Sequence, residues 1–243
     1  MTHDIDLAES LFAAIRSGDL TVLGQIVHDH AALASAPLGG RHSTRTPLHV
    51  AADWPGYFSN GVHVVRMLIA AGADPNARGP ADETPLHWAA SSDDADVAAA
   101  LIDGGADVNA PGGSIGTPLA NAVGYCCWHV ARLLVDRGAR ADEAWQAAAV
   151  GKVDRLEELL ADHPTQQEVS QAFWHACAAG QRRAAEYLLV RGADINWTPD
   201  YAKGTPLDAA SASSTRQQNV MSWLRTLGAR SSDGADPEAT DAD

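Results

Sequence analysis

A four-residue motif recurs along the chain, and this recurrence limits the available folds more than any other feature. Thr-Pro-Leu-His occurs at residues 46–49 and 84–87, and shortened copies begin at Thr117 and Thr205. A second motif, Gly-Ala-Asp-x-Asn, occurs at residues 72–76, 105–109 and 192–196. Because the two motifs recur in phase, we expect repeated units that bury their apolar faces only by stacking on one another.

Each part of the repeat has a physical reason, which residues 84–109 illustrate. Thr84 is a suitable N-cap, and Pro85 suits the first helical position, where its missing N–H costs nothing. Leu86 and Ala89 lie on one helical face, and small side chains there allow close helix packing. Gly105 is a suitable left-handed terminator for the second helix. The pattern predicts two short helices followed by a turn that leads into the next unit.

These residues resemble the ankyrin-repeat family, whose period is roughly 33 residues. The resemblance covers about residues 7–230 and implies an all-α solenoid of helix–turn–helix units with projecting β-turn fingers. We therefore expect residues 1–230 to form an ankyrin-repeat domain of about seven repeats, the first and last acting as caps. Residues 231–243 carry five acidic side chains and almost nothing apolar, so they are expected to form an acidic disordered tail.

Composition narrows the classes of partner. The formal net charge of −14 disfavours nucleic acid, and no apolar run is long enough to predict a membrane span. Three cysteines, at positions 126, 127 and 177, give no disulfide framework and favour a reducing, cytoplasmic compartment. The preference for Arg over Lys, with abundant Ala and Gly, points to a bacterial source. Scattered histidines match no metal spacing, and no cofactor motif occurs.

Departures from the repeat are the better guide to function. The segment 53–61 lengthens the turn between the two helices of the second repeat and carries Trp54, Tyr57 and Phe58. Two interpretations stay open: Trp54 and Phe58 fold back over the solenoid edge, or the aromatic side chains form a rim for a ligand or peptide. The β-turn finger at 197–204 is also long, and it carries two aromatic and two charged side chains. Its side chains, Trp197, Asp200 and Tyr201, suit contact with a partner.

Three other segments also depart from the repeat. In ankyrin proteins a glycine usually joins the two helices of a unit, and here Asp93 and Cys126 take that position. Asp tolerates a left-handed backbone, whereas Cys126 predicts a turn of different shape. The glycine-rich stretch 109–116 lacks the Gly-Lys-Ser/Thr ending of a phosphate loop and is expected to be an ordinary finger.

The resemblance also implies which residues face the concave groove. One position in each first helix gives a row along the stack, extended by Ser91, Ser92 and Tyr125: Val50, Trp88, Asn121, Gln146, His175 and Ala209. Four consecutive members are polar or aromatic, which suits a polar pocket with an aromatic wall. The alternative is that these side chains bond only to each other or to water.

The motif histidines and their replacements have a structural interpretation. The resemblance implies that His49 and His87 bond to neighbouring backbone and stiffen the stack. Trp145 and Trp174 occupy the same position in later units and are expected to fill the seam between repeats.

Two functions follow from these features. The preferred one is a protein-binding module without catalytic residues, whose binding residues lie in the groove and finger tips: Trp54, Tyr57, Trp88, Ser92, Asn121, Tyr125, Gln146, His175, Trp197, Asp200 and Tyr201. The alternative is a small-molecule-binding protein or a motif-free cyclase or isomerase, with His175 as acid–base and Asn121 and Gln146 as oxyanion donors. An enclosed pocket around Trp88, Asn121 and His175 favours the alternative, and an open groove with protruding aromatic side chains favours the module.

Overall fold

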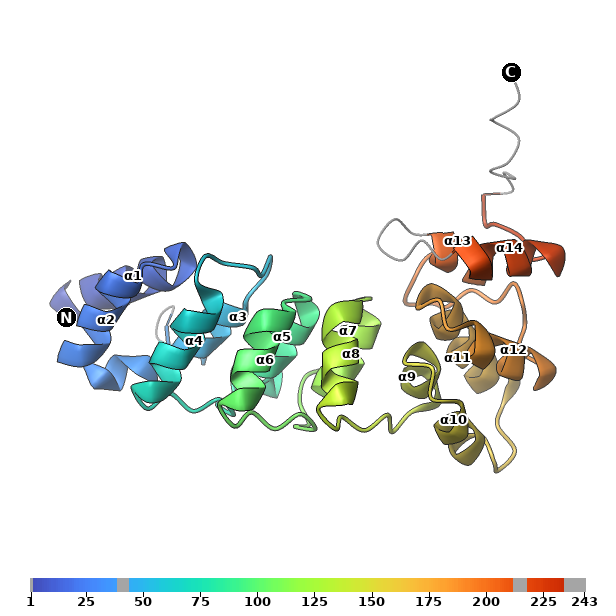
Figure 1. Cartoon of the computed structure of the whole chain (residues 1–243), viewed down its shortest axis with the longest axis horizontal. Coiled ribbons are helices and arrows are strands. Elements are labelled where there is room, and N and C mark those ends of the chain that lie inside the picture. Colours follow the sequence, from blue (N-terminus) through green and yellow to red (C-terminus); the bar gives the residue numbers. More distant parts are fainter. Residues whose placement is uncertain (1, 39–43, 212–217, 234–243) are drawn as a thin grey trace, which may run out of the picture. The chain divides into compact units, whose positions relative to one another are not determined.

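The structure is a computed structural model that describes residues 2–38, 44–211 and 218–233 (Figure 1). All regular secondary structure in these residues is helical, apart from one isolated β-bridge between Gly112 and Gly116. The chain divides into two compact units, Met1–Arg140 and Ala141–Asp243, which we call the first and second units. The prediction of an all-α repeat fold is confirmed.

The first unit consists of helix pairs that stack in order. The pairs are α1 (Thr2–Ser17) with α2 (Leu20–Asp29), α3 (Pro47–Ala52) with α4 (Gly61–Ala70), α5 (Pro85–Ser91) with α6 (Ala95–Asp103), and α7 (Pro118–Gly124) with α8 (Trp128–Asp136). Two short 3₁₀ helices, η1 (Ala31–Ala34) and η2 (Pro80–Asp82), lie in the connections. Helices α1, α3, α5 and α7 pack successively on one another, and α2, α4, α6 and α8 form a second row.

The second unit repeats this arrangement. Its pairs are α9 (Ala144–Ala149) with α10 (Val153–Leu159), α11 (Gln166–Ala178) with α12 (Arg182–Val190), and α13 (Pro206–Ser211) with α14 (Gln218–Thr226). Helix α11 packs against both α9 and α13, and α10 packs against α12. Fully buried Phe173 on α11 meets Trp223 of α14 with ring centroids 6.5 Å apart.

We call the segment that connects consecutive helix pairs a finger. The Thr-Pro-Leu-His motif forms a helix cap and also a hydrogen-bonded joint to the next finger. At α5, the backbone N–H of Thr84 donates to Nδ1 of His87 over 3.1 Å, which completes a capping box. Nε2 of the same ring lies 3.0 Å from the carbonyl oxygen of Gly116, and since a carbonyl only accepts, Nε2 carries the proton. His49 makes the same pair of bonds with Thr46 and Glu83. The predicted structural role of both histidines is confirmed.

The Gly-Ala-Asp-x-Asn motif connects consecutive fingers through its asparagine. The side-chain oxygen of Asn76 accepts a 2.8 Å hydrogen bond from the N–H of Asp107, and its amide donates to the Gly105 carbonyl. Asn109 accepts in the same way from the N–H of Arg140. The glycine-rich stretch is one of these fingers, and Gly113 N–H donates to the Ala81 carbonyl over 2.9 Å. Each copy of the motif thus closes one backbone turn and braces the next.

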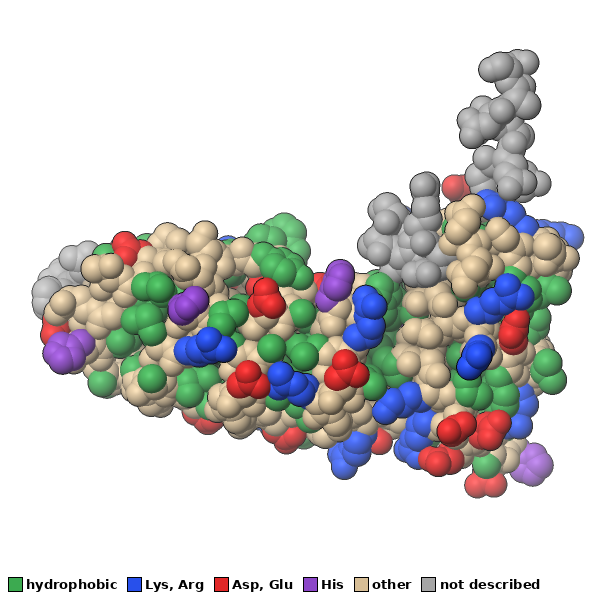
Figure 2. Space-filling view, in the orientation of Figure 1, with side chains coloured by type: hydrophobic (Ala, Val, Ile, Leu, Met, Phe, Trp, Pro, Cys, Tyr) green, Lys and Arg blue, Asp and Glu red, His purple; other side chains and the backbone are tan. Residues whose placement is uncertain are grey.

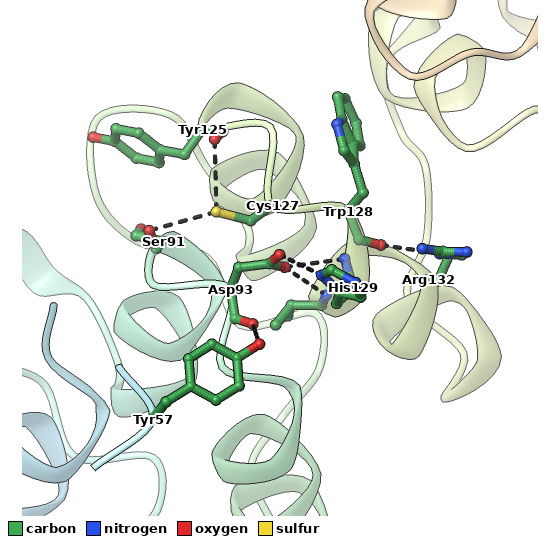
Figure 3. A network of polar contacts seen from close by, with 9 residues as sticks. Tyr57, Ser91, Asp93, Tyr125, Cys127, Trp128, His129 and Arg132 are labelled. Atoms are coloured by element: carbon green, nitrogen blue, oxygen red, sulfur yellow. Dashed lines mark hydrogen bonds and ion pairs between the residues drawn. The ribbon is translucent and has the colours of Figure 1, made fainter. Parts of the chain in front are cut away.

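Asp93 and Cys126, which replace the expected glycines, both have left-handed backbones, with φ of 53° and 58°. The prediction that Cys126 gives a turn of different shape is therefore wrong. Asp93 has a further role, because its Oδ1 accepts from the N–H groups of His129 and Val130 at the start of α8, each over 3.0 Å. Its Oδ2 lies 2.6 Å from Nδ1 of His129 (Figure 3). The aspartate of one pair thus caps the second helix of the next.

Replacing Asp93 with Ala is expected to lower the free energy of unfolding by about 2 kcal/mol. About half comes from the lost cap, and the rest from forcing alanine into a left-handed backbone. Asp93→Asn keeps the accepting oxygen and tolerates the backbone, so it should cost under about 1 kcal/mol. Urea unfolding of the three proteins measures the difference. Equal losses in both variants would contradict the capping role.

The boundary of the predicted tail is refined by the residues after α14. Ser231 donates its hydroxyl to Oδ1 of Asp208 over 2.6 Å, and the N–H of Ser232 donates to Oδ2 over 2.9 Å. These two residues therefore pack with the last helix pair. Residues 234–243 of the expected disordered tail lie outside the described residues.

Candidate functional site

The predicted groove row is divided between the two units. Trp88 and Asn121 belong to the first unit, and Gln146 and His175 belong to the second. Neither unit by itself therefore contains all three residues of the enzyme alternative, His175, Asn121 and Gln146. That alternative stays a prediction.

The first unit contains a pocket of about 220 Å³ beside α5. It is lined by residues of three consecutive helix pairs, and we call it the Trp88 pocket: Asp53, Trp54, Glu83, Trp88, Ser91, Ser92 and Tyr125. Four predicted binding residues, Trp54, Trp88, Ser92 and Tyr125, thus line one pocket. Sequence reasoning missed the carboxylates of Asp53 and Glu83. Glu83 directly precedes the Thr84 cap, so its position at the start of the groove helix was the available signal.

The rim of the Trp88 pocket is aromatic and exposed. Trp54 in the α3–α4 turn is 73% exposed, and Tyr125 at the end of α7 is 59% exposed. Hydrophobic side chains stand out at the α3–α4 turn in the space-filling view (Figure 2). Phe58 of the same turn folds back under the guanidinium of Arg16, 4.1 Å from its ring centroid. The expectation that Phe58 covers the edge is met, whereas the same expectation for Trp54 is wrong.

The pocket wall is held by contacts between successive pairs. The ring of Trp88 lies edge-on to His49 with centroids 5.2 Å apart. Ser92 donates its hydroxyl to the carbonyls of Ala52 and Trp88, over 3.1 and 3.0 Å. The predicted binding role of Ser92 is therefore accompanied by a structural one, since its hydroxyl ties α5 to α3.

A polar network lies under the pocket. Asn121 is 1% exposed, and its side-chain amide donates to Oε1 of Glu83 over 3.0 Å and to Oγ of Ser91 over 3.2 Å. Among the described residues, neither Oδ1 of Asn121 nor Nε1 of Trp88 has a hydrogen-bond partner, although both atoms are buried. Buried polar atoms without hydrogen-bond partners are uncommon in folded proteins.

The two carboxylates of the pocket differ in how far they are neutralised. Oδ2 of Asp53 lies 3.6 Å from a guanidinium nitrogen of both Arg16 and Arg45. Within the part of the chain that the structure describes, Glu83 forms no ion pair with a basic side chain. The negative charge available to a ligand is therefore that of Glu83.

Tyr57 does not join the Trp88 pocket. Its hydroxyl donates to the carbonyl of Asp93 over 2.5 Å (Figure 3). Its backbone N–H donates to the carboxylate of Asp94. It lines a separate recess of about 340 Å³ with Phe58, His63 and other residues. Tyr57 thus ties the long turn to the next helix pair, although its ring remains largely exposed.

In the second unit, His175 is the buried centre of an aromatic cluster. Trp145 and Trp174 lie with ring centroids 5.0 and 5.1 Å from it, and the Tyr201 hydroxyl lies 3.0 Å from Nε2. Burial lowers the pKa of His175 to about 4, so the imidazole is neutral at pH 7. Its Nδ1 has no described partner.

The remaining predicted residues of the second unit have structural contacts or none. Tyr201, expected at a finger tip, instead turns back onto α11 and also accepts from the side-chain amide of Gln171 over 3.2 Å. Gln146 accepts from the N–H of Asp142 and so holds the start of α9. Trp197 is half-buried, whereas Asp200 is exposed. Trp174 fills the seam as expected, with its indole N–H donating to the Gly204 carbonyl over 3.1 Å.

The described residues contain neither a metal-binding cluster nor a membrane-spanning helix. In those residues no group of three or more His, Cys, Asp and Glu side chains is arranged to hold a metal ion. No described helix combines the length and apolarity needed to cross a membrane.

Comparison with known proteins agrees with this geometry. Residues 57–143 match the family model described as ankyrin repeats in three copies. These residues are ankyrin repeats. The search of curated proteins found no match.

Solved structures extend the likeness along the chain. The ankyrin-repeat domain of Bcl-3, described as a unique member of the IkappaB protein family, is 25% identical with a TM-score of 0.52. The alignment covers 89% of this chain and 97% of that domain. The ankyrin-repeat domain of human ASB11 is 27% identical with a TM-score of 0.44, over 79% of this chain and 89% of that one. The likeness to the Bcl-3 ankyrin-repeat domain extends beyond residues 57–143.

Proposed function

We propose that this chain is a binding module that recognises a partner protein through the groove side of its first unit. Ankyrin repeats generally mediate protein–protein binding, and the chain carries such repeats. The observation that carries the proposal is the pair of exposed aromatic side chains, Trp54 and Tyr125, on the rim of a pocket floored by Trp88. Large aromatic side chains beside a pocket are typical of energetic centres in protein interfaces.

The size and openness of the site favour a protein over a small molecule. At about 220 Å³ the Trp88 pocket is smaller than the roughly 300–1,000 Å³ of most small-molecule sites. It fits one side chain, and its exposed rim leaves room for the rest of a partner. The free cysteines and the preference for Arg over Lys support a bacterial cytoplasm as the compartment we propose.

The test is site-specific photocrosslinking inside the cell of origin. A photoreactive amino acid at position 125 should capture a distinct protein, whereas the same amino acid at exposed position 66 on α4 should not. The captured protein is then purified and its binding measured by calorimetry. We expect Trp54→Ala and Tyr125→Ala each to weaken binding at least tenfold and Arg66→Ala to leave it unchanged. Equal crosslinking at both positions, or binding indifferent to both aromatic side chains, would overturn the proposal.

A further inference from the structure

The charges that line the Trp88 pocket favour a cationic ligand. Glu83 lines the pocket, and its Oε1 accepts one hydrogen bond from the side-chain amide of Asn121. Its other carboxylate oxygen has no hydrogen bond or ion pair among the described residues. A partly buried carboxylate without a counter-cation favours a positively charged ligand, and the net charge of −14 attracts one at longer range.

The walls of the pocket complement that charge. Trp54, Trp88 and Tyr125 contribute aromatic rings from three consecutive helix pairs. Aromatic faces attract cations, with Trp the strongest, and a guanidinium adds stacking because it is planar. An ammonium carries the same charge but cannot stack or form two parallel bonds to a carboxylate.

The same turn already binds a guanidinium in this way within the chain. The Arg16 side chain lies over the Phe58 ring, 4.1 Å from its centroid. It also donates to the Trp54 carbonyl over 3.3 Å and lies 3.6 Å from the Asp53 carboxylate. The α3–α4 turn therefore holds an arginine beside an aromatic ring and a carboxylate. The Trp88 pocket offers the same two elements, and no described basic side chain is among its lining residues.

We propose that the Trp88 pocket anchors an arginine side chain of the partner protein, with Glu83 pairing its guanidinium and Trp54, Trp88 and Tyr125 enclosing it. The proposal rests on the proposed function, since it names the chemistry by which that site selects its partner. The pocket volume of about 220 Å³ suits one long side chain. An arginine in an exposed, basic segment of the partner meets these requirements.

The experiment uses small probes on the whole chain, so it does not need the partner. N-acetyl-arginine methylamide is titrated into ¹⁵N-labelled protein while the tryptophan indole signals are followed by NMR. Trp54→Phe and Trp88→Phe assign the two signals. We expect both to shift with arginine, and the neutral, nearly isosteric citrulline derivative to shift neither. Equal shifts with citrulline, or binding of the lysine or trimethyl-lysine derivative at least as tight as that of arginine, would overturn the proposal.

Variants locate the binding to named groups. Glu83→Gln should weaken arginine binding about tenfold, and Tyr125→Ala, at an exposed position, should weaken it several-fold. Asp136→Asn removes an exposed carboxylate from α8 and should change nothing. Unchanged affinity in both pocket variants contradicts the assignment. Failure of these titrations with a partner still dependent on Trp54 and Tyr125 refutes only the arginine anchor. Arginine binding to the pocket with a partner indifferent to Trp54 and Tyr125 refutes the partner-binding function and, with it, the assignment of the arginine to that partner.

Discussion

Replacing His87 with Ala is expected to lower the free energy of unfolding of the first unit by about 3 kcal/mol. The ring is fully buried and makes two bonds at once, accepting from the N–H of Thr84 and donating to the carbonyl of Gly116. Its removal leaves both backbone groups unpaired at roughly 1–3 kcal/mol each, together with a cavity. Urea unfolding followed by circular dichroism measures the loss.

The chain itself supplies a matched partial rescue. Helix α13 has Asp208 at the corresponding position, where its carboxylate accepts from the Thr205 N–H over 2.8 Å. His87→Asp can therefore restore the cap but cannot donate to Gly116, so we expect a loss between those of wild type and His87→Ala. His63→Ala, at an exposed position of α4, serves as the control and should cost little. A loss below about 1 kcal/mol for His87→Ala would show that the joint contributes little.

Acid should destabilise the second unit through His175. Burial lowers the pKa of this imidazole to about 4, against roughly 6.5 in an unfolded chain. Between these values the unfolded state binds a proton that the folded state does not, so the free energy of unfolding falls as the pH falls from 6.5 to 4. At about 1.36 kcal/mol per pKa unit, the whole loss is on the order of 3 kcal/mol. Below pH 4 this residue contributes no further loss.

Hydrogen exchange of α11 peptides across that pH range, corrected for the intrinsic rate, reports the local free energy. In His175→Gln, which does not titrate, we expect protection to decline much less between pH 6.5 and 4 than in wild type. His28→Gln, at an exposed position of α2, should follow wild type. A parallel decline in wild type and His175→Gln would refute the assignment of the pH dependence to His175.

The features that sequence predicted well are those that recur. The Thr84 cap and the His87 joint follow from a motif that is present twice. Its threonine and histidine form hydrogen bonds with backbone groups at the start of the helix and in the next finger. The sequence predicted part of the Trp88 pocket, because Trp88 lies in a helix and the helical period indicates which way its side chain points. Glu83, just before the helix, lies outside that periodicity and was missed.

Irregular segments were predicted less well for the same reason. Tyr57 and Tyr201 both lie in lengthened connections, where no period indicates the direction of a side chain. Both were expected to be free for a partner, yet their hydroxyls bond to the Asp93 carbonyl and to His175. The left-handed backbone of Cys126 shows the converse effect, since stacking between repeats imposes the turn on a residue that disfavours it.

The indole of Trp174 has a consequence for how the molecule tolerates acid. It bonds to the Gly204 carbonyl where the first unit uses His49 and His87 for the equivalent contact. Burial lowers the pKa of both histidines, and protonation at Nδ1 takes away the acceptor that holds the threonine N–H. An indole neither gains nor loses a proton in this range. Trp174 shows that a tryptophan, which does not titrate, can donate the hydrogen bond at the joint in place of a histidine. It is therefore a template for building acid-tolerant repeats.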